Sequence, residues 1–360
     1  MLPKSRPINA SAQETSHSAR GVKASRAWLL VLLLVPGLTA GQGPASTSTP
    51  DEIVVIGRQP GPPMWRVLDG DRVLWIFPRL TPVPKGMVWE SDKVAGVIAQ
   101  AQEVLERPNI GADLSARLYL NPVNLFRGMR LAKKLSRDPA GRTLEQQLPP
   151  ELYSRFRAIE ARYFPKDPER LEEQRPAVAA VRMVGIVQPK EGLVGDDDIQ
   201  KTIARLIRGN RGIQRTVIEV KIDLEGGFGD LARRAEELTA SLDPALELEC
   251  FESQLSRMEN DIDKMRRRAD SWARGYIDDF RGVALPGGED DSCRALVALS
   301  SERNVVVEAR AKLESLWLTN AVRALSTHRT TFAILPIADL LRSDGPIAQL
   351  KARGYEVREP

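Results

Sequence analysis

Two β-rich blocks lie near opposite ends of this chain, and the long stretch between them has mainly helical spacing. The first block, Met64–Phe77, has two arms rich in Val, Leu and Trp around Asp69-Gly70, a favoured type I′ turn pair. The second block is Thr331–Val357. The predicted fold class is α+β, with a mixed β-sheet formed by the N- and C-terminal segments, a large helical insertion and one long amphipathic helix.

The end of each block carries a segment whose residues can be compared with a known motif. The C-terminal strand runs into Pro336-Ile-Ala-Asp339, and Gly345-Pro346, a helical segment and Gly354-Tyr-Glu-Val357 follow. This block resembles the TraB/GumN family, in which a strand ends in Gly-x-x-His, a Gly-Pro-x-Gly turn follows, and a helix leads into Gly-Tyr-x-Val. The N-terminal hairpin resembles the family's opening hairpin, which also leads into Gly-x-x-His, and here Pro78-Arg-Leu-Thr81 stands there. We call Pro78–Thr81 and Pro336–Asp339 the first and second motif segments.

The resemblance implies a site that binds a divalent metal through the two histidines and performs hydrolysis, which is proteolysis in the Tiki relatives. In this chain Pro78 and Pro336 replace the glycines, and Thr81 and Asp339 replace the histidines. Proline fixes φ near −65° and removes a backbone donor, so the turn that presents the ligand should change shape. Threonine is a poor metal ligand. We therefore expect no metal and no other cofactor at this site.

Two features keep a reworked site open as an alternative. Ser301-Glu-Arg303-Asn304 resembles the family's Glu-Arg-Asn segment, so Arg303 and Asn304 complete the set of family-site positions. Asp339 could also hold an oxygen-binding cation with Glu90, Glu219 or Glu302, although exposed carboxylates are common at turns between a strand and a helix. The catalytic residues, if there are any, are not identified by the sequence.

These observations give two hypotheses on function. The favoured one is a non-catalytic, exported TraB/GumN-like protein, a pseudoenzyme that acts as a binding or scaffolding paralogue for an unknown protein or peptide partner. The alternative is a hydrolase with a reworked active site around Asp339, Arg303 and Asn304. The sequence itself does not name a ligand.

The N-terminus has the pattern of a secretory signal peptide over residues 1–40. Basic residues precede the apolar run Ala27–Val35, and small residues follow up to Ala40-Gly41. The run is too short to span a bilayer, which needs about 20 apolar residues. We therefore expect a protein exported to the periplasm or secreted, with no transmembrane segment after cleavage of the signal.

The charge balance argues against nucleic acid as a partner. The net charge is +4, with 52 Lys and Arg against 48 Asp and Glu. Residues 1–40 account for this whole excess, so the rest of the chain is neutral. A nucleic-acid-binding protein needs a basic excess on its surface.

Cleavage of the signal peptide would leave His328 as the single histidine, which limits histidine-based metal sites and catalytic triads. We expect His328 to lie at the C-terminal end of a helix.

The remaining chain is predicted to contain a linker and one domain. Residues 41–62 combine a polar, small-residue linker with a short strand at Ile53–Ile56. Residues 63–360 form a single TraB/GumN-like domain, with a helical insertion at about 91–190. Two domains that divide near Gly192 are the alternative.

A heptad pattern stands out in the middle of the chain. Apolar residues recur at alternating steps of four and three, the spacing of a seam for a partner helix. The seam consists of Phe251, Leu255, Met258, Ile262, Met265, Ala269, Trp272 and Tyr276. It predicts one long helix over 251–276 whose partner is 303–325 or a second subunit, so a homo-oligomer through this helix is one possibility.

Cys250 and Cys293 flank the predicted helix, and in an exported protein such a pair is expected to form a disulfide.

We expect the chain to be cleaved near Ala40 or Gly41, because the basic, apolar and small-residue regions occur in the order that signal peptidases recognise. Mass spectrometry of the N-terminus of the protein recovered from cells measures this. An intact chain from Met1 in the cytoplasm would contradict the prediction.

Overall fold

In the computed structural model, the described residues are 61–113, 122–166, 170–223, 228–282, 285, 292–293, 296 and 303–360. Residues 56–360 form one compact unit, to which all of these belong. The expected signal peptide, most of the linker and the expected strand at 53–56 lie outside the described residues.

A mixed sheet joins the two ends of the described chain, as the sequence predicts. Among the described residues it has six strands in the order β10-β1-β2-β9-β4-β7. The strands are β1 (Trp65–Asp69), β2 (Arg72–Arg79), β4 (Glu103–Leu105), β7 (Gln214–Thr216), β9 (Thr330–Pro336) and β10 (Glu356–Arg358). β1 pairs antiparallel with β10 and with β2, and the pairs β2–β9, β9–β4 and β4–β7 are parallel. The α+β class is therefore confirmed.

The predicted hairpin is present, but its turn lies one residue later than the expected Asp69-Gly70 pair. Asp69 pairs with Arg72 at the end of the β1–β2 ladder, so the two central residues are Gly70, with φ +60°, and Asp71, whose φ is not positive; a type I′ turn needs a positive φ at both. Glycine adopts this left-handed conformation without the steric cost that a Cβ brings. Val67, Leu74 and Ile76 are wholly buried, so the hairpin forms part of the core.

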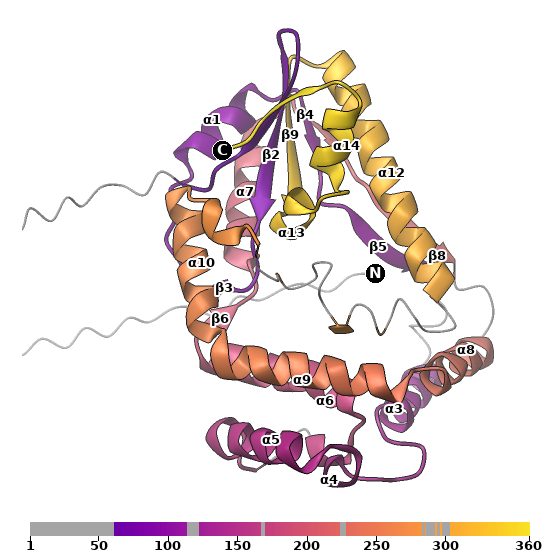
Figure 1. Ribbon diagram of the computed structural model, residues 1–360. Coiled ribbons are helices and arrows are strands. Elements are labelled where there is room, and N and C mark those ends of the chain that lie inside the picture. The colour runs from indigo at the N-terminus through magenta and orange to yellow at the C-terminus, as the bar shows by residue number, and fades with distance from the viewer. Residues whose placement is uncertain are drawn as a thin grey trace, which may run out of the picture. The chain divides into compact units, whose positions relative to one another are not determined.

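Helices cover both faces of the sheet. α12 (Arg303–Thr327) packs on β1, β2, β4 and β9, and α14 (Pro346–Ala352) lies beside it. The other face is covered by α1 (Asp92–Gln100), which packs on β9 and on α7 (Asp197–Gly209) (Figure 1). The short helix α13 (Ile337–Leu341) follows β9 directly.

A second hydrophobic core is formed by helices alone. It is built mainly by α4 (Leu144–Gln147), α5 (Pro150–Tyr163), α6 (Pro176–Lys190), α9 (Pro244–Asn260) and the start of α10 (Ile262–Arg274). α9 packs chiefly along α6, and α5 covers both (Figure 1). The disulfide between Cys250 and Cys293 lies in this core, so the pairing expected from the sequence is present.

The remaining elements are short strands and peripheral helices. β3 (Val83–Pro84) pairs with β6 (Leu193–Val194), and β5 (Asn109–Asp113) pairs with β8 (Glu219–Asp223). α3 (Pro122–Leu135) packs on α8 (Phe228–Ala240). Two 3₁₀ turns, η1 (Leu171–Glu173) and η2 (Asp278–Phe280), complete the described elements.

The prediction of one long helix over 251–276 is wrong. Two helices, α9 and α10, meet at Asp261, which ends one and begins the other with φ −112° and ψ 0°. Asp favours helix ends because its side chain competes for backbone hydrogen bonds. The seam is therefore shared between the two cores: Phe251 to Met265 lie in the helical core, and Ala269 and Trp272 lie in the sheet core. The partner of α9 is α6 and not the helix at 303–325.

Two other predicted elements differ from the structure. The interval 91–190 is not wholly helical, because β4 belongs to the main sheet and β5 to a small one. Apolar and polar residues alternate over 216–222, which predicts a single half-buried strand, but the structure has two strands there, β7 and β8, which belong to different sheets. Both errors have one cause: the strands have three to five residues, too few for a periodic pattern to stand out.

Candidate functional site

The two motif segments lie side by side at the carboxyl ends of parallel strands. β2 pairs with β9 in a register that puts Pro78 opposite Leu335 and Arg79 opposite Pro336. The first motif segment thus starts at the end of β2, and the second starts at the last residue of β9. Ligands in sheets of this kind commonly bind outside the carboxyl ends of the strands.

A cavity of about 270 Å³ opens beside the second motif segment. Three parts of the chain contribute its walls: the β4–β5 connection, the middle of α12, and the segment from the end of β9 to the start of α14. Its lining residues are Pro108, Asn109, Ile110, Arg310, Leu313, Glu314, Trp317, Leu335, Pro336, Asp339, Arg342 and Pro346. The cavity therefore combines an apolar wall with two acidic and two basic side chains.

Arg342 organises the charged side of the cavity. Its guanidinium donates to Glu314 at 2.7 Å, pairs with Asp344, and lies 3.7 Å from Oδ1 of Asp339. Burial alone would lower the pKa of Arg342, but its hydrogen bonds to Glu314 and Asp344 raise that pKa above its ordinary value. Arg342 is therefore a permanent cation that holds three carboxylates around it.

Trp317 contributes its ring to the apolar side of the cavity. The residue is only 1% exposed, and its indole Nε1 is buried with no hydrogen-bond acceptor within the described part of the chain. A buried N–H without an acceptor costs about 1–3 kcal/mol, so Trp317 is held here by packing and not by a polar contact.

The turn after α13 is held close to Asp339. A Cβ on Gly345 would collide with the backbone carbonyl of Asp339, so only glycine fits there. Gly345 also begins α14, with Pro346 as its first residue, where the missing N–H of proline removes no helical hydrogen bond. The resemblance to the family predicts this Gly-Pro pair. The pair fixes the turn at which Pro346 lines the cavity.

The first motif segment has a different environment. Arg79 donates to Asp196 at 2.6 Å, and Asp196 also accepts from Gln200 at 2.8 Å. The backbone carbonyl of Pro78 accepts a hydrogen bond of 2.7 Å from the indole N–H of Trp272. Thr81 is half-buried and is not one of the described residues that line the cavity. The segment is thus bound to α7 and α10.

The other predicted residues lie further away. Arg303 and Asn304 are the first residues of α12, and their side chains lie outside the described residues. Arg303 is eleven residues before Glu314, roughly 16 Å along the helix at 1.5 Å per residue. His328 follows the end of α12, as predicted, and its Nε2 lies 3.3 Å from the buried carboxylate of Glu103. It is at the opposite end of β9 from Asp339, about 20 Å away at ~3.3 Å per residue.

These residues do not fit the metal that the family motif implies. Thr81 offers a hydroxyl, and Asp339 offers a carboxylate that lies close to the guanidinium of Arg342. A site for such a metal needs several free nitrogen, sulfur or oxygen ligands. Glu90 and Glu219 do not line the cavity, and Glu302 lies outside the described residues. Among the described residues, no three His, Cys, Asp or Glu side chains cluster so that they could hold a metal ion.

Four lining residues of α12 were not foreseen from the sequence. Arg310, Leu313, Glu314 and Trp317 follow at steps of three, one and three, which places them on one face of the helix. The spacing could have been noticed, but it does not say that this face meets the turn after β9. Arg342, three residues after Asp339, could have been found as its i, i+3 partner.

Comparison with known proteins identifies the family. A model of the TraB/PrgY/gumN family matches residues 63–359. The chain therefore belongs to the TraB/PrgY/gumN family. No curated protein and no solved structure matches it.

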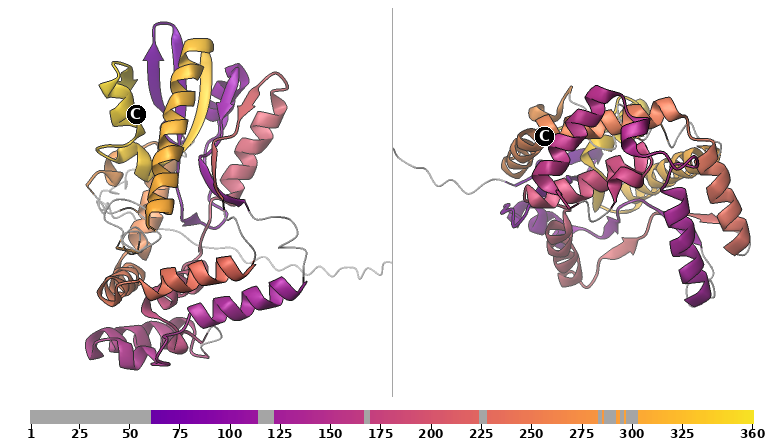
Figure 2. Two further views of the ribbon diagram at one scale, coloured as in Figure 1. Left: turned by 90° about the vertical axis from the view of Figure 1, so that its right-hand side faces the viewer. Right: turned by 90° about the horizontal axis from the view of Figure 1, so that it is seen from below.

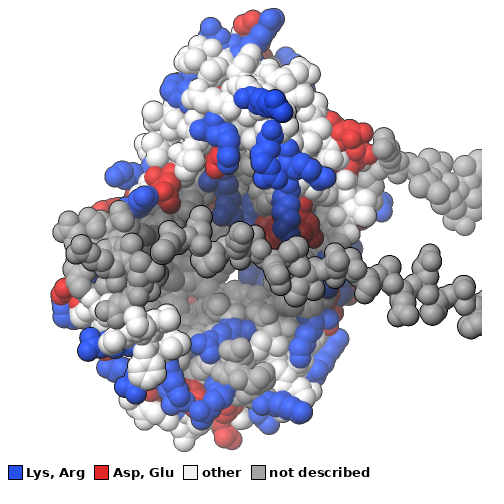
Figure 3. Space-filling view, turned by 180° about the vertical axis from the view of Figure 1, so that it is seen from behind, with Lys and Arg blue, Asp and Glu red and all other residues white. Residues whose placement is uncertain are grey.

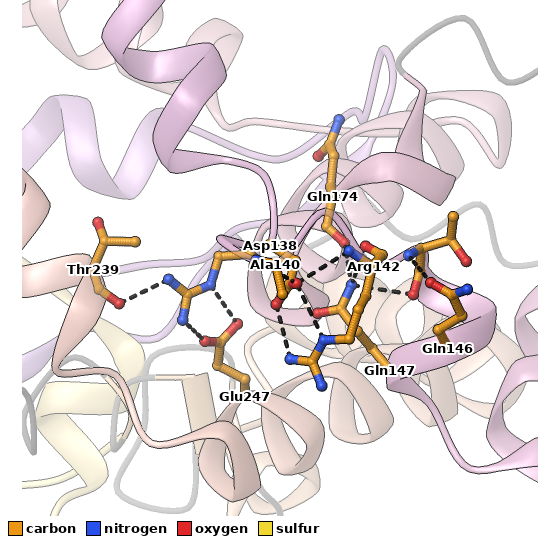
Figure 4. A network of polar contacts seen from close by, with 10 residues as sticks. Asp138, Ala140, Arg142, Gln146, Gln147, Gln174, Thr239 and Glu247 are labelled. Carbon is orange, nitrogen blue, oxygen red and sulfur yellow. Dashed lines mark hydrogen bonds and ion pairs between the residues drawn. The ribbon is translucent and has the colours of Figure 1, made fainter.

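A second, smaller cavity of about 100 Å³ lies in the helical part and is lined mainly by polar side chains. Arg175, directly before α6, pairs there with Glu247 of α9 and donates to the carbonyl of Thr239 in α8 at 2.7 Å. Both partners are at least 90% buried. Beside them Arg142 binds Asp138, whose pKa is held below its ordinary value by these hydrogen bonds (Figure 4). Since Arg175 and Glu247 satisfy each other, this cluster connects three helices.

Substitution of Arg175 by Ala is expected to destabilise the protein by about 3–5 kcal/mol, because Glu247 would remain buried without its cation. Chemical denaturation measures the free energy of unfolding. The control is Arg142→Ala, whose side chain is 54% exposed, and its expected loss is much smaller because solvent screens the pair. The double variant R175M/E247M should be more stable than R175A, and equal losses in R175A and R142A would contradict this account.

Proposed function

We propose that this protein is an exported, non-catalytic member of the TraB/PrgY/gumN family that binds a peptide segment of a partner in the cavity at the end of β9. It is in this sense a pseudoenzyme with a binding or scaffolding role. The fold brings the two motif segments together as in a family site, while their side chains supply recognition groups and no metal ligands.

One observation carries this proposal. Asp339, at the position of a family histidine, lines a cavity whose charged side is organised by Arg342 and whose apolar side includes Leu313 and Trp317. The cavity thus offers a charged wall and an apolar wall to the same ligand. Such a constellation is suited to binding.

The size and lining of the cavity support a peptide as the ligand. Pockets for drug-sized ligands have about 300–1,000 Å³, so a cavity of about 270 Å³ accommodates one or two amino-acid residues. Leu313, Ile110 and the prolines offer contact to an apolar side chain, and Arg310 and Glu314 lie on the same cavity wall as charged neighbours for the peptide backbone.

Export is supported by two independent features. The leader has the order of regions of a signal peptide, and the disulfide between Cys250 and Cys293 belongs to oxidising compartments. Among the described residues no helix is long and apolar enough to cross a membrane.

We expect the purified protein to hold no stoichiometric zinc, manganese or cobalt after dialysis, and to show no metal-dependent peptidase activity. Elemental analysis and a peptide-cleavage assay measure this. The variant T81H/D339H should recover little metal affinity, because Pro78 and Pro336 still shape the two turns. Changing both prolines to glycine as well should recover more. Stoichiometric metal in the wild type that is lost on Asp339→Ala would instead establish the alternative, a hydrolase around Asp339, Arg303 and Asn304.

Leu313→Ser is expected to weaken peptide binding about three- to tenfold, because it removes apolar contact from the cavity wall. The probe is a mixture of N-acetylated tripeptides, and binding is measured by ligand-observed NMR. Val88→Ser, at an exposed site that does not line the cavity, serves as the control. The binding proposal is wrong if the wild type binds none of the tripeptides or if L313S binds them equally well.

A further inference from the structure

α3 displays an unusual concentration of exposed apolar side chains. Among the described residues, nine large hydrophobic side chains are exposed, and four of these belong to α3: Val123, Leu125, Phe126 and Met129, with exposures of 51–62%. No described side chain of α3 is buried. Single exposed hydrophobic residues are normal on a protein surface, but a cluster of this kind marks an interaction site.

The outer side of α3 is defined by the way the helix packs on α8. The half-buried residues Asn124, Gly128, Leu131 and Leu135 follow at steps of four, three and four and form the stripe towards α8. Lys134 adds an ion pair of 2.8 Å with Glu236 of α8. Figure 2 shows the two helices side by side. At about 100° per residue, Leu125, Phe126 and Met129 lie outside this stripe.

Basic residues border the apolar cluster. α3 contains Arg127, Arg130, Lys133 and Lys134 and no acidic residue. The guanidinium of Arg130 lies 4.3 Å from the ring centroid of Phe126, so cation and apolar surface are in direct contact. At about 100° per residue, Lys133 lies between Met129 and Phe126 on the helix surface, so the cations are interleaved with the apolar side chains. Exposed apolar residues together with cations are found on helices that lie in the interface of an anionic membrane.

We propose that the outer face of α3 binds to the surface of a negatively charged phospholipid bilayer. Leu125, Phe126 and Met129 insert among the lipid chains near the headgroups. Arg130 and Lys133 contact the phosphates, and Arg127, further round the helix, adds to the positive potential. A second copy of the chain fits this face less well, because pairing it with itself would bring these three cations against the same three, while Lys134 is already paired with Glu236. The inference is independent of the cavity at the end of β9.

The test uses vesicles of phosphatidylcholine with 30% phosphatidylglycerol, and vesicles of phosphatidylcholine alone for comparison. Because each lost apolar contact and each lost charge weakens binding, L125S/F126S/M129S and R127E/R130E should each bind the anionic vesicles at least tenfold more weakly than wild type. Sedimentation with the vesicles measures this, and circular dichroism and thermal melting show that the variants are folded. Hydrogen exchange of the peptide 122–135 should slow in the presence of anionic vesicles, which localises the contact whatever the N-terminus contributes.

Matched controls distinguish this site from general attraction. α7 also exposes Arg205 and Arg208 but no large hydrophobic residue, on a molecule whose surface carries basic side chains elsewhere (Figure 3). R205E/R208E makes the same change in charge as R127E/R130E and should bind at least fivefold more tightly than it. Val181→Ser, which alters an exposed residue of α6, should bind like wild type. Equal losses in the two charge variants, unchanged exchange in 122–135, or dimerisation through α3 without vesicle binding would overturn the proposal.

Discussion

The parallel pairing of β2 with β9 is the contact on which the rest of the structure depends. It joins residues 72–79 to residues 330–336, and the remaining elements of the sheet attach on either side of it. Because the two strands run in the same direction, their last residues meet at one edge. This pairing alone brings the two motif segments together, although about 250 residues separate them in sequence. The helical part is inserted between two strands that must pair.

At that edge, the charged side chains around the two motif segments are paired with one another. Gly345 and Pro346 form the turn next to Asp339, and the hairpin leads into the first motif segment. Arg79 pairs with Asp196, and Arg342 pairs with Glu314 and Asp344. These ion pairs fix the carboxylates beside guanidinium groups, and attraction between the opposite charges stabilises the turns that carry them.

The sequence predicted the features that rest on local signals. The β1–β2 hairpin, whose turn is displaced by one residue, and the end of α12 at His328 are set by residues close to one another in the chain. The cavity was not predicted, because its walls depend on which face of α12 meets the turn after β9. The heptad seam was also misread for a reason that lies outside the local sequence. Its spacing continues across Asp261, but one helix ends there and another begins, and the seam residues pack into two different cores. The period of the apolar residues cannot reveal this.

α10 explains how a helical insertion can remain coupled to the sheet. Ile262 and Met265 at its start belong to the helical core, while Trp272 near its end packs against Phe77, with ring centroids 5.8 Å apart. The same indole donates to the carbonyl of Pro78. A single helix of 13 residues thus connects the helical core to the first residue of the first motif segment. Proline has no N–H to give to the pairing of β2 with β9, so the bond from Trp272 to its carbonyl adds a contact that the strand pairing does not provide at this position, and it links the start of the first motif segment to the packing of α10.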